Sequence, residues 1–242
     1  MIRITFLGTS HGVPEHDRFC SSTLIEIGEN RYLIDMGGPV IDSLIRRNIP
    51  LDSIRGIFIT HPHGDHMDGL VSFVDLLTWY FQTPTPEIWL PTDGIVEALN
   101  SWLKVTQLDG VAPRLSFNIL KEGLIFDDGT LRVTAIPTQH CPHSHAFLLE
   151  AEGKSIVFTG DLRHPTIDFP QVCFQRTCDL IVCEAAHFPT TEAAPIFEKA
   201  APKRVLINHI CPWRHLPSIE TVRQSERSYE FDCVWDGYEL TL

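Results

Sequence analysis

The sequence predicts an α/β fold in which two mixed sheets lie between layers of helices. Segments with the apolar pattern of strands alternate with segments whose apolar residues recur at helical spacing. Several strand-like segments are joined by short turns, so hairpins are mixed with helices, which favours two stacked sheets over one parallel sheet. Hydrophobic residues make up 43% of the 242 residues, enough to fill a large core. We expect a single domain over residues 1–242.

The first half of the chain holds the clearer pattern. Its predicted strands are short runs of apolar residues that end at turn residues, and they cover residues 2–8, 22–28, 31–35, 54–60 and 87–90. Its predicted helices carry an apolar stripe at helical spacing, and they cover residues 40–48, 68–82 and 93–105. A polar loop with Gly12 and Pro14 separates the first strand from the hairpin that follows.

The second half is predicted to contain hairpins and then alternating strands and helices. Asp127-Asp128-Gly129 and Glu152-Gly153-Lys154 are turn sequences, and each joins two strand-like runs. The predicted strands lie within residues 124–136, 144–151, 155–159, 180–183, 204–207 and 233–242. One predicted helix, at about residues 190–201, separates two of these strands.

Composition excludes several classes of protein. The formal net charge is −12, from 31 acidic and 19 basic residues, so the whole chain lacks the basic surface of a nucleic-acid-binding protein. Seven cysteines, without a Cys-x-x-Cys pair, argue against a disulfide framework. The N-terminal residues are too short an apolar run for a signal peptide, and no apolar run could span a membrane. A reducing, cytoplasmic location without a membrane partner is the expectation.

The most informative feature is a cluster of metal-binding side chains directly after a predicted strand. His61, His63, Asp65 and His66 lie within six positions, following the apolar run 56–60. His61 and His63 point the same way if the chain stays extended, and the residues after Gly64 can turn toward a neighbouring point. Imidazole and carboxylate groups bind divalent metals such as zinc, so six residues can supply ligands to two ions.

Three further candidates each follow a predicted strand: His140, Asp161 and His209. Ligands at the ends of several strands converge on one edge of a sheet and are held more rigidly than ligands on one loop. Two nearby histidines, His143 and His145, compete with His140 for the same role. The residues alone leave that choice open.

The order of these segments resembles the metallo-β-lactamase superfamily. The resemblance runs from about residue 6 to residue 214 and implies a four-layer αββα sandwich with two divalent ions, zinc first and manganese or iron as alternatives. It implies that one ion is held by His61, His63 and His140, that the other is held by Asp65, His66 and His209, and that Asp161 bridges them. Two ions that share a carboxylate can also share a hydroxide, which is the expected nucleophile.

Two stretches resemble the ribonuclease Z and cyclic-phosphodiesterase branch. One is the opening Phe6-Leu7-Gly8-Thr9-Ser10-His11-Gly12-Val13-Pro14, and the other surrounds Glu184 and His187. In that branch a glutamate and a histidine form a proton-donating pair, and an imidazolium can protonate the leaving alkoxide. The match is imperfect, because Cys183 stands where a histidine is common. The candidate catalytic residues are therefore Asp65, Glu184 and His187.

The expected activity is a phosphodiesterase acting on a small or cyclic phosphodiester. Long RNA is not the expected substrate, because only 22 residues separate Asp161 from Glu184 and they contain no basic, glycine-rich arm. Related enzymes are often dimers, so a second copy of the chain is a candidate partner. One alternative is a metal-dependent hydrolase of a carbonyl ester, namely a thioester, lactone or β-lactam. The other is a metal-binding scaffold without activity.

Overall fold

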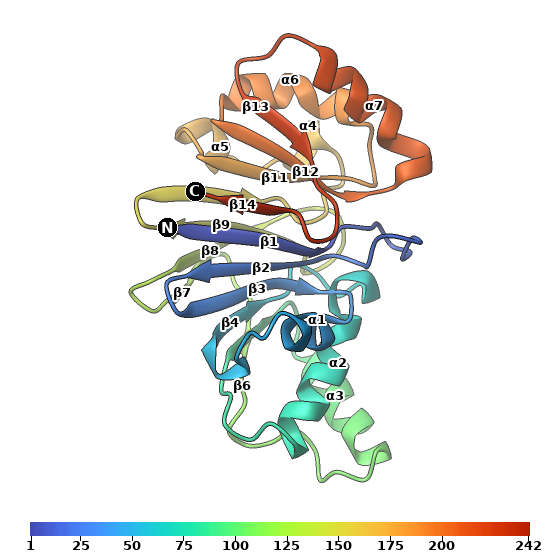
Figure 1. The fold of residues 1–242 in the computed structure, drawn as a ribbon, viewed down its shortest axis with the longest axis vertical. Coiled ribbons are helices and arrows are strands. Elements are labelled where there is room, and N and C mark those ends of the chain that lie inside the picture. Colours follow the sequence, from blue (N-terminus) through green and yellow to red (C-terminus); the bar gives the residue numbers. More distant parts are fainter.

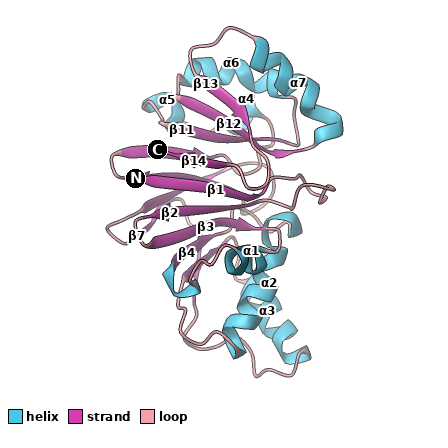
Figure 2. Cartoon of the chain, in the orientation of Figure 1, coloured by secondary structure: helices cyan, strands magenta, loops and turns pink.

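The computed structural model describes all residues 1–242 and contains two seven-stranded sheets stacked between two layers of helices (Figures 1 and 2). The first sheet consists of β1 (Ile2–Gly8), β2 (Ser22–Ile27), β3 (Asn30–Met36), β4 (Ile54–Phe58), β5 (Glu87–Leu90), β6 (Ser116–Ile119) and β14 (Glu239–Thr241). The second consists of β7 (Gly123–Asp127), β8 (Arg132–Pro137), β9 (His145–Ala151), β10 (Lys154–Phe158), β11 (Leu180–Ala185), β12 (Arg204–Ile210) and β13 (Glu230–Cys233).

Both sheets are mixed in the same way. In the first, β14, β1, β2 and β3 are antiparallel neighbours, whereas β3 to β6 are parallel. In the second, β7 to β10 are antiparallel, whereas β10 to β13 are parallel. The parallel strands of each sheet all end at one edge, where the connecting loops can bring side chains together.

Three apolar layers hold the sandwich together. A central core of buried residues from both sheets includes Phe6, Phe58 and Phe147. A second core lies between the first sheet and α1 (Val40–Arg46), α2 (Gly64–Trp79) and α3 (Gly94–Val105). A third lies between the second sheet and α5 (Val172–Gln175), α6 (Thr190–Ala200) and α7 (Pro212–Gln224). The short helix α4 (Pro165–Asp168) lies against α6. Figure 1 shows the two helical layers on opposite sides of the paired sheets. None of the helices has the length and apolarity needed to cross a bilayer.

The structure differs from the predicted elements at one helix start, in several unexpected elements and at the C-terminus. Helix α2 begins at Gly64, earlier than the predicted residue 68, so Asp65 and His66 lie on its first turn. Helices α4, α5 and α7 and strand β6 were not expected. The predicted C-terminal strand 233–242 is divided between the sheets, because β13 ends the second sheet while β14 pairs with β1. The expected α/β class with two mixed sheets between helical layers is confirmed.

Candidate metal centre

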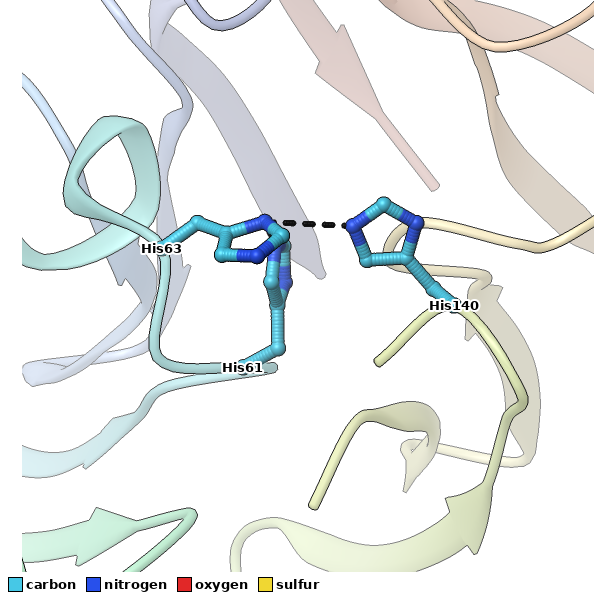
Figure 3. A group of neighbouring side chains, drawn as sticks. All are labelled: His61, His63 and His140. Atoms are coloured by element: carbon cyan, nitrogen blue, oxygen red, sulfur yellow. Dashed lines mark hydrogen bonds between the residues drawn. The ribbon is translucent and has the colours of Figure 1, made fainter. Parts of the chain in front are cut away.

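Three histidines from two loops meet at the edge of the two sheets (Figure 3). His61 follows β4, His63 directly precedes α2, and His140 lies between β8 and β9. Nδ1 of His63 lies 3.1 Å from Nε2 of His61 and 3.1 Å from Nε2 of His140. A tetrahedral zinc ion bound at 2.0–2.1 Å keeps its nitrogen ligands about 3.3 Å apart. These rings therefore have the spacing needed to hold one ion.

A second group of ligand atoms lies beside the first. The carboxylate Oδ2 of Asp65 is 3.4 Å from Nε2 of His66 and 3.7 Å from Nε2 of His209. Asp65 and His66 come from the first turn of α2, whereas His209 is the sixth residue of β12 in the other sheet. The three atoms lie close enough together to share a metal ion.

Asp161 lies between the two groups. Its Oδ2 is 3.6 Å from Nε2 of His61, 3.7 Å from Nε2 of His140 and 3.3 Å from Nε2 of His209. Its Oδ1 is 3.4 Å from Nε2 of His66. The structure thus brings all seven predicted ligands together, and Asp161 is the carboxylate that lies beside histidines of both groups.

The choice among the three histidines of the loop before β9 is also visible. His140 reaches His63, whereas Nδ1 of His145 is hydrogen-bonded to the carbonyl oxygen of His143 at 3.0 Å. His143 and His145 belong to none of the groups whose atoms could share an ion. Of the three, His140 is the one placed at the cluster.

The residues fit a divalent metal by chemistry as well as by spacing. Nε2 of His66 and Oδ1 of Asp161 are buried without a hydrogen-bond partner, which is costly unless a ligand satisfies them. Burial lowers the pKa of His61 to about 2, so its imidazole is neutral, as a metal ligand must be. Burial raises the pKa of Asp65, but the hydrogen bond and charge of His66 outweigh burial and hold the pKa at about 2. That carboxylate is ionised at neutral pH.

Asp35, which no pattern in the sequence singles out, orients one of these ligands. Its Oδ1 accepts the Thr60 N–H at 2.7 Å, and its Oδ2 accepts Nδ1 of His66 at 2.7 Å. Because Nδ1 of His66 donates to Asp35, its Nε2 carries the lone pair that faces the cluster. Thr60 Oγ1 and Ser21 Oγ lie near the corresponding Nδ1 atoms of His61 and His209, at 3.0 and 2.9 Å.

Two β-bulges aim side chains at the cluster. Asp35 is skipped in the pairing of β2 with β3, where Thr23 pairs with Ile34 and Ser22 with Met36, and its φ is 60°. His209 is likewise skipped between β11 and β12 and has a φ of 49°. A left-handed conformation at a residue other than glycine is uncommon, and bulges are used to redirect side chains next to functional sites. Neither bulge has a signature in the sequence.

Replacing Asp35 by asparagine should weaken metal binding about 10–100-fold, the usual loss when the partner of a ligating histidine is removed. The asparagine amide has one oxygen instead of two, so it cannot accept hydrogen bonds from Thr60 and His66 on separate oxygens. Competition with a coloured zinc chelator measures the change. Asp128→Asn is the control, because Asp128 also accepts a 2.7 Å hydrogen bond, from Tyr32, but its hydrogen-bond partners include none of the proposed metal ligands. Equal affinities in the two variants would contradict the role of Asp35.

Glu184 and His187 form a pair at the border of the cluster. Nδ1 of His187 donates to Oε2 of Glu184 at 2.7 Å and lies 3.7 Å from Oδ2 of Asp161. The same glutamate accepts the backbone N–H groups of Leu162 at 2.6 Å and of His187 at 3.0 Å. These bonds fix the carboxylate, and the carboxylate fixes the imidazole, whose ring centre is 4.5 Å from that of His140.

The pair is suited to donating a proton. Glu184 is buried, whereas 37% of the surface of the His187 side chain is exposed. Burial lowers the pKa of His187, but the hydrogen bond and charge of Glu184 outweigh burial and raise the pKa to about 9. With Nδ1 occupied by Glu184, the other ring nitrogen, Nε2, is the one free to act on a bound substrate.

The amino-acid sequence of this chain is similar to a known family and to several ribonuclease Z proteins. A family model described as Anti-Pycsar protein Apyc1 matches residues 2–195. The ribonuclease Z of Picosynechococcus sp. is 33% identical over 141 residues, which are 57% of this chain and 44% of the relative. This chain therefore spans less than half of that relative. The ribonuclease Z of Mycobacterium marinum is 25% identical over 266 residues, covering 91% of this chain and 93% of the relative.

Solved structures share the fold at low sequence identity. The metallo-β-lactamase fold protein YhfI from Bacillus subtilis superposes with a TM-score of 0.79 at 17% identity, and the alignment covers 99% of this chain and 98% of YhfI. At this level of identity the likeness establishes the fold. It agrees with the four-layer sandwich derived from the sheets and helices.

Proposed function

Because the chain belongs to the family described as Anti-Pycsar protein Apyc1, we propose that it is a metal-dependent hydrolase of phosphodiester bonds. The resemblance to the metallo-β-lactamase superfamily, and to its ribonuclease Z and phosphodiesterase branch, is confirmed. The prediction that the chain is a metal-dependent hydrolase is confirmed by its similarity to ribonuclease Z and phosphodiesterase-like proteins. We propose, in addition, the type of bond that is cleaved, the class of substrate and the number of metal ions.

The Glu184–His187 pair is the observation that favours a phosphodiester over a carbonyl ester as the substrate. Cleavage of such an ester releases an alkoxide, which leaves far more readily if a positioned acid protonates it. His187 is held 2.7 Å from the carboxylate and faces Asp161 and His140 across the cluster. Hydrolysis of a thioester, lactone or β-lactam needs the metal ligands but depends less on a second, separately placed acid.

The proposed ligand set follows the two groups of atoms. His61, His63 and His140 would hold one divalent ion, Asp65, His66 and His209 would hold a second, and Asp161 would bridge them. Zinc suits the imidazole-rich set best, and manganese or iron are the alternatives. When bound, such ions act as Lewis acids and lower the pKa of coordinated water toward neutrality. The protein contributes the rigid placement of the ligands by Asp35, Thr60 and Ser21.

We propose a small or cyclic substrate. A cavity of about 480 Å³ adjoins Asp65, with Phe19, Pro39 and Asp68 among its lining residues. That volume is typical of sites for small molecules. The short segment between Asp161 and Glu184 forms only α4, α5, the turns around them and the start of β11 (Leu180–Ala185), so it offers no arm to grip a long RNA. The charge of −12 also disfavours a large polyanion.

A panel of substrates tests the proposal. The zinc-loaded protein is assayed with bis(p-nitrophenyl) phosphate, 3′,5′-cyclic nucleotides, an aliphatic thioester and an aliphatic lactone. We expect turnover of the phosphodiesters and not of the carbonyl esters. Turnover of the carbonyl esters alone would overturn the assignment in favour of the second class of hydrolase. Zinc binding with no turnover of any ester would identify a metal-binding scaffold.

A further inference from the structure

We propose that Asp168 is a positioning residue that ties the loop of His140 to the loop of Asp161. Asp168 is the last residue of α4 and only 9% of its surface is exposed. It is seven positions beyond Asp161 in the chain, and neither the ligand set nor the Glu184–His187 pair includes it. The inference rests on the proposed metal site, because its consequence is the separation of two proposed ligands.

A single carboxylate oxygen joins the two loops. Oδ2 of Asp168 accepts the backbone N–H of Gln139 at 2.7 Å and that of Arg163 at 3.0 Å. Gln139 directly precedes His140, and Arg163 follows Asp161 by two positions. The other oxygen, Oδ1, accepts the N–H of His164 at 3.2 Å, within the second loop only. The bridging function therefore belongs to Oδ2.

An ionised carboxylate is suited to this position. A buried charge is costly unless it is hydrogen-bonded, and here three backbone N–H groups satisfy it. Hydrogen bonds to a charged acceptor are roughly twice as strong as neutral ones. Another hydrogen bond between the loops runs from Thr138 Oγ1 to the carbonyl oxygen of Asp161, at 3.3 Å. It is neutral and longer, so Asp168 provides the stronger connection.

The connection fixes the distance between two proposed ligands. Nε2 of His140 and Oδ2 of Asp161 lie 3.7 Å apart, one on the loop that joins β8 to β9 and the other on the loop that follows β10. If the loops could separate, each binding event would have to bring them together again at the expense of affinity. Loss of such an outer contact typically weakens metal binding 10–100-fold.

The test is zinc affinity of the full chain, measured by chelator competition, in three variants. Asp168→Ala removes both acceptors, and we expect affinity to fall about tenfold or more. Asp168→Asn keeps one oxygen that can still accept from Gln139 and Arg163, so it should lose less than Asp168→Ala. Asp179→Ala is the matched control. Asp179 is equally buried, at 9% exposure, and accepts the Ser155 N–H at 3.0 Å, but at the opposite end of β11 from the cluster.

Two affinity results would overturn the proposal: wild-type affinity in Asp168→Ala, or an equal fall in Asp168→Ala and Asp179→Ala, which would mean general destabilisation. Hydrogen exchange of the metal-free protein gives a second readout, which holds even if the wild type binds no zinc and the proposed function fails. The backbone amides of Gln139 and Arg163 should exchange slowly both in the wild type and in Asp168→Asn, whereas the amide of His164 should exchange faster in Asp168→Asn than in the wild type. If Asp168→Ala does not fold, the comparison of the wild type with Asp168→Asn tests the proposal. Fast exchange of the Gln139 amide in the wild type would refute the connection.

Discussion

Asp161→Ala is expected to abolish hydrolysis and to leave the protein with little bound metal. Asp161 is the residue whose carboxylate oxygens lie within 3.3–3.7 Å of ligand nitrogens from both groups. Burial raises the pKa of this carboxyl, but His209 and His66 outweigh burial and hold the pKa well below its ordinary value. Without this carboxylate, the histidines of both groups face one another with no negative charge between them. The loss of metal affinity should exceed the roughly 10–100-fold typical of an outer partner.

Metal content by elemental analysis and turnover of bis(p-nitrophenyl) phosphate are measured on the same preparation. Asp161→Asn serves as the second variant, because it keeps the size of the side chain and removes the charge. We expect it to bind metal more weakly than the wild type and to be inactive. Wild-type activity together with a full complement of metal in Asp161→Ala would exclude the bridging role. Loss of activity with metal retained would restrict Asp161 to positioning.

The sequence predicts those site residues that lie close together in the chain or directly after an apolar run. The cluster from His61 to His66 is dense enough to identify directly, and the strand before it is a plain apolar run. The residues His140, Asp161 and His209 could be selected because each follows such a strand. Asp161 and His209 reach one edge because β10, β11 and β12 are parallel. His140 reaches the same edge because β8 and β10 are both antiparallel to β9 and so end on the same side.

What the sequence could not supply depends on long-range geometry. Asp35 reaches His66 only because a bulge turns its side chain, and Asp168 reaches Gln139 only because α4 folds back on the loop before β9. Helix α7 escaped prediction because Pro212 and Pro217 both lie within it. Pro212 is accommodated in the first turn, where the missing N–H has no helical partner, and the buried faces of Ile219 and Val222 stabilise the rest.

His187→Ala should slow hydrolysis of alkyl phosphodiesters by about 10²-fold or more while leaving metal content unchanged. His187 lies at the border of the proposed ligand set, and its Nδ1 is committed to Glu184 at 2.7 Å. A general acid matters most when the leaving group is a strong base. The variant should therefore lose much more on a cyclic nucleotide, which releases an alkoxide, than on bis(p-nitrophenyl) phosphate, which releases a stable phenolate.

Two further measurements separate proton donation from a structural role. His164→Ala is the matched control, because His164 also pairs with a carboxylate, that of Glu192 at 2.6 Å, but outside the cluster. It should keep the wild-type rate on both substrates. Added imidazole should restore part of the rate in His187→Ala, since the deleted ring leaves a space beside Glu184 that a free imidazole can enter. Equal losses on the two substrates, without rescue, would show that His187 acts by placing Asp161 or His140, because a defect in metal geometry slows both leaving groups alike.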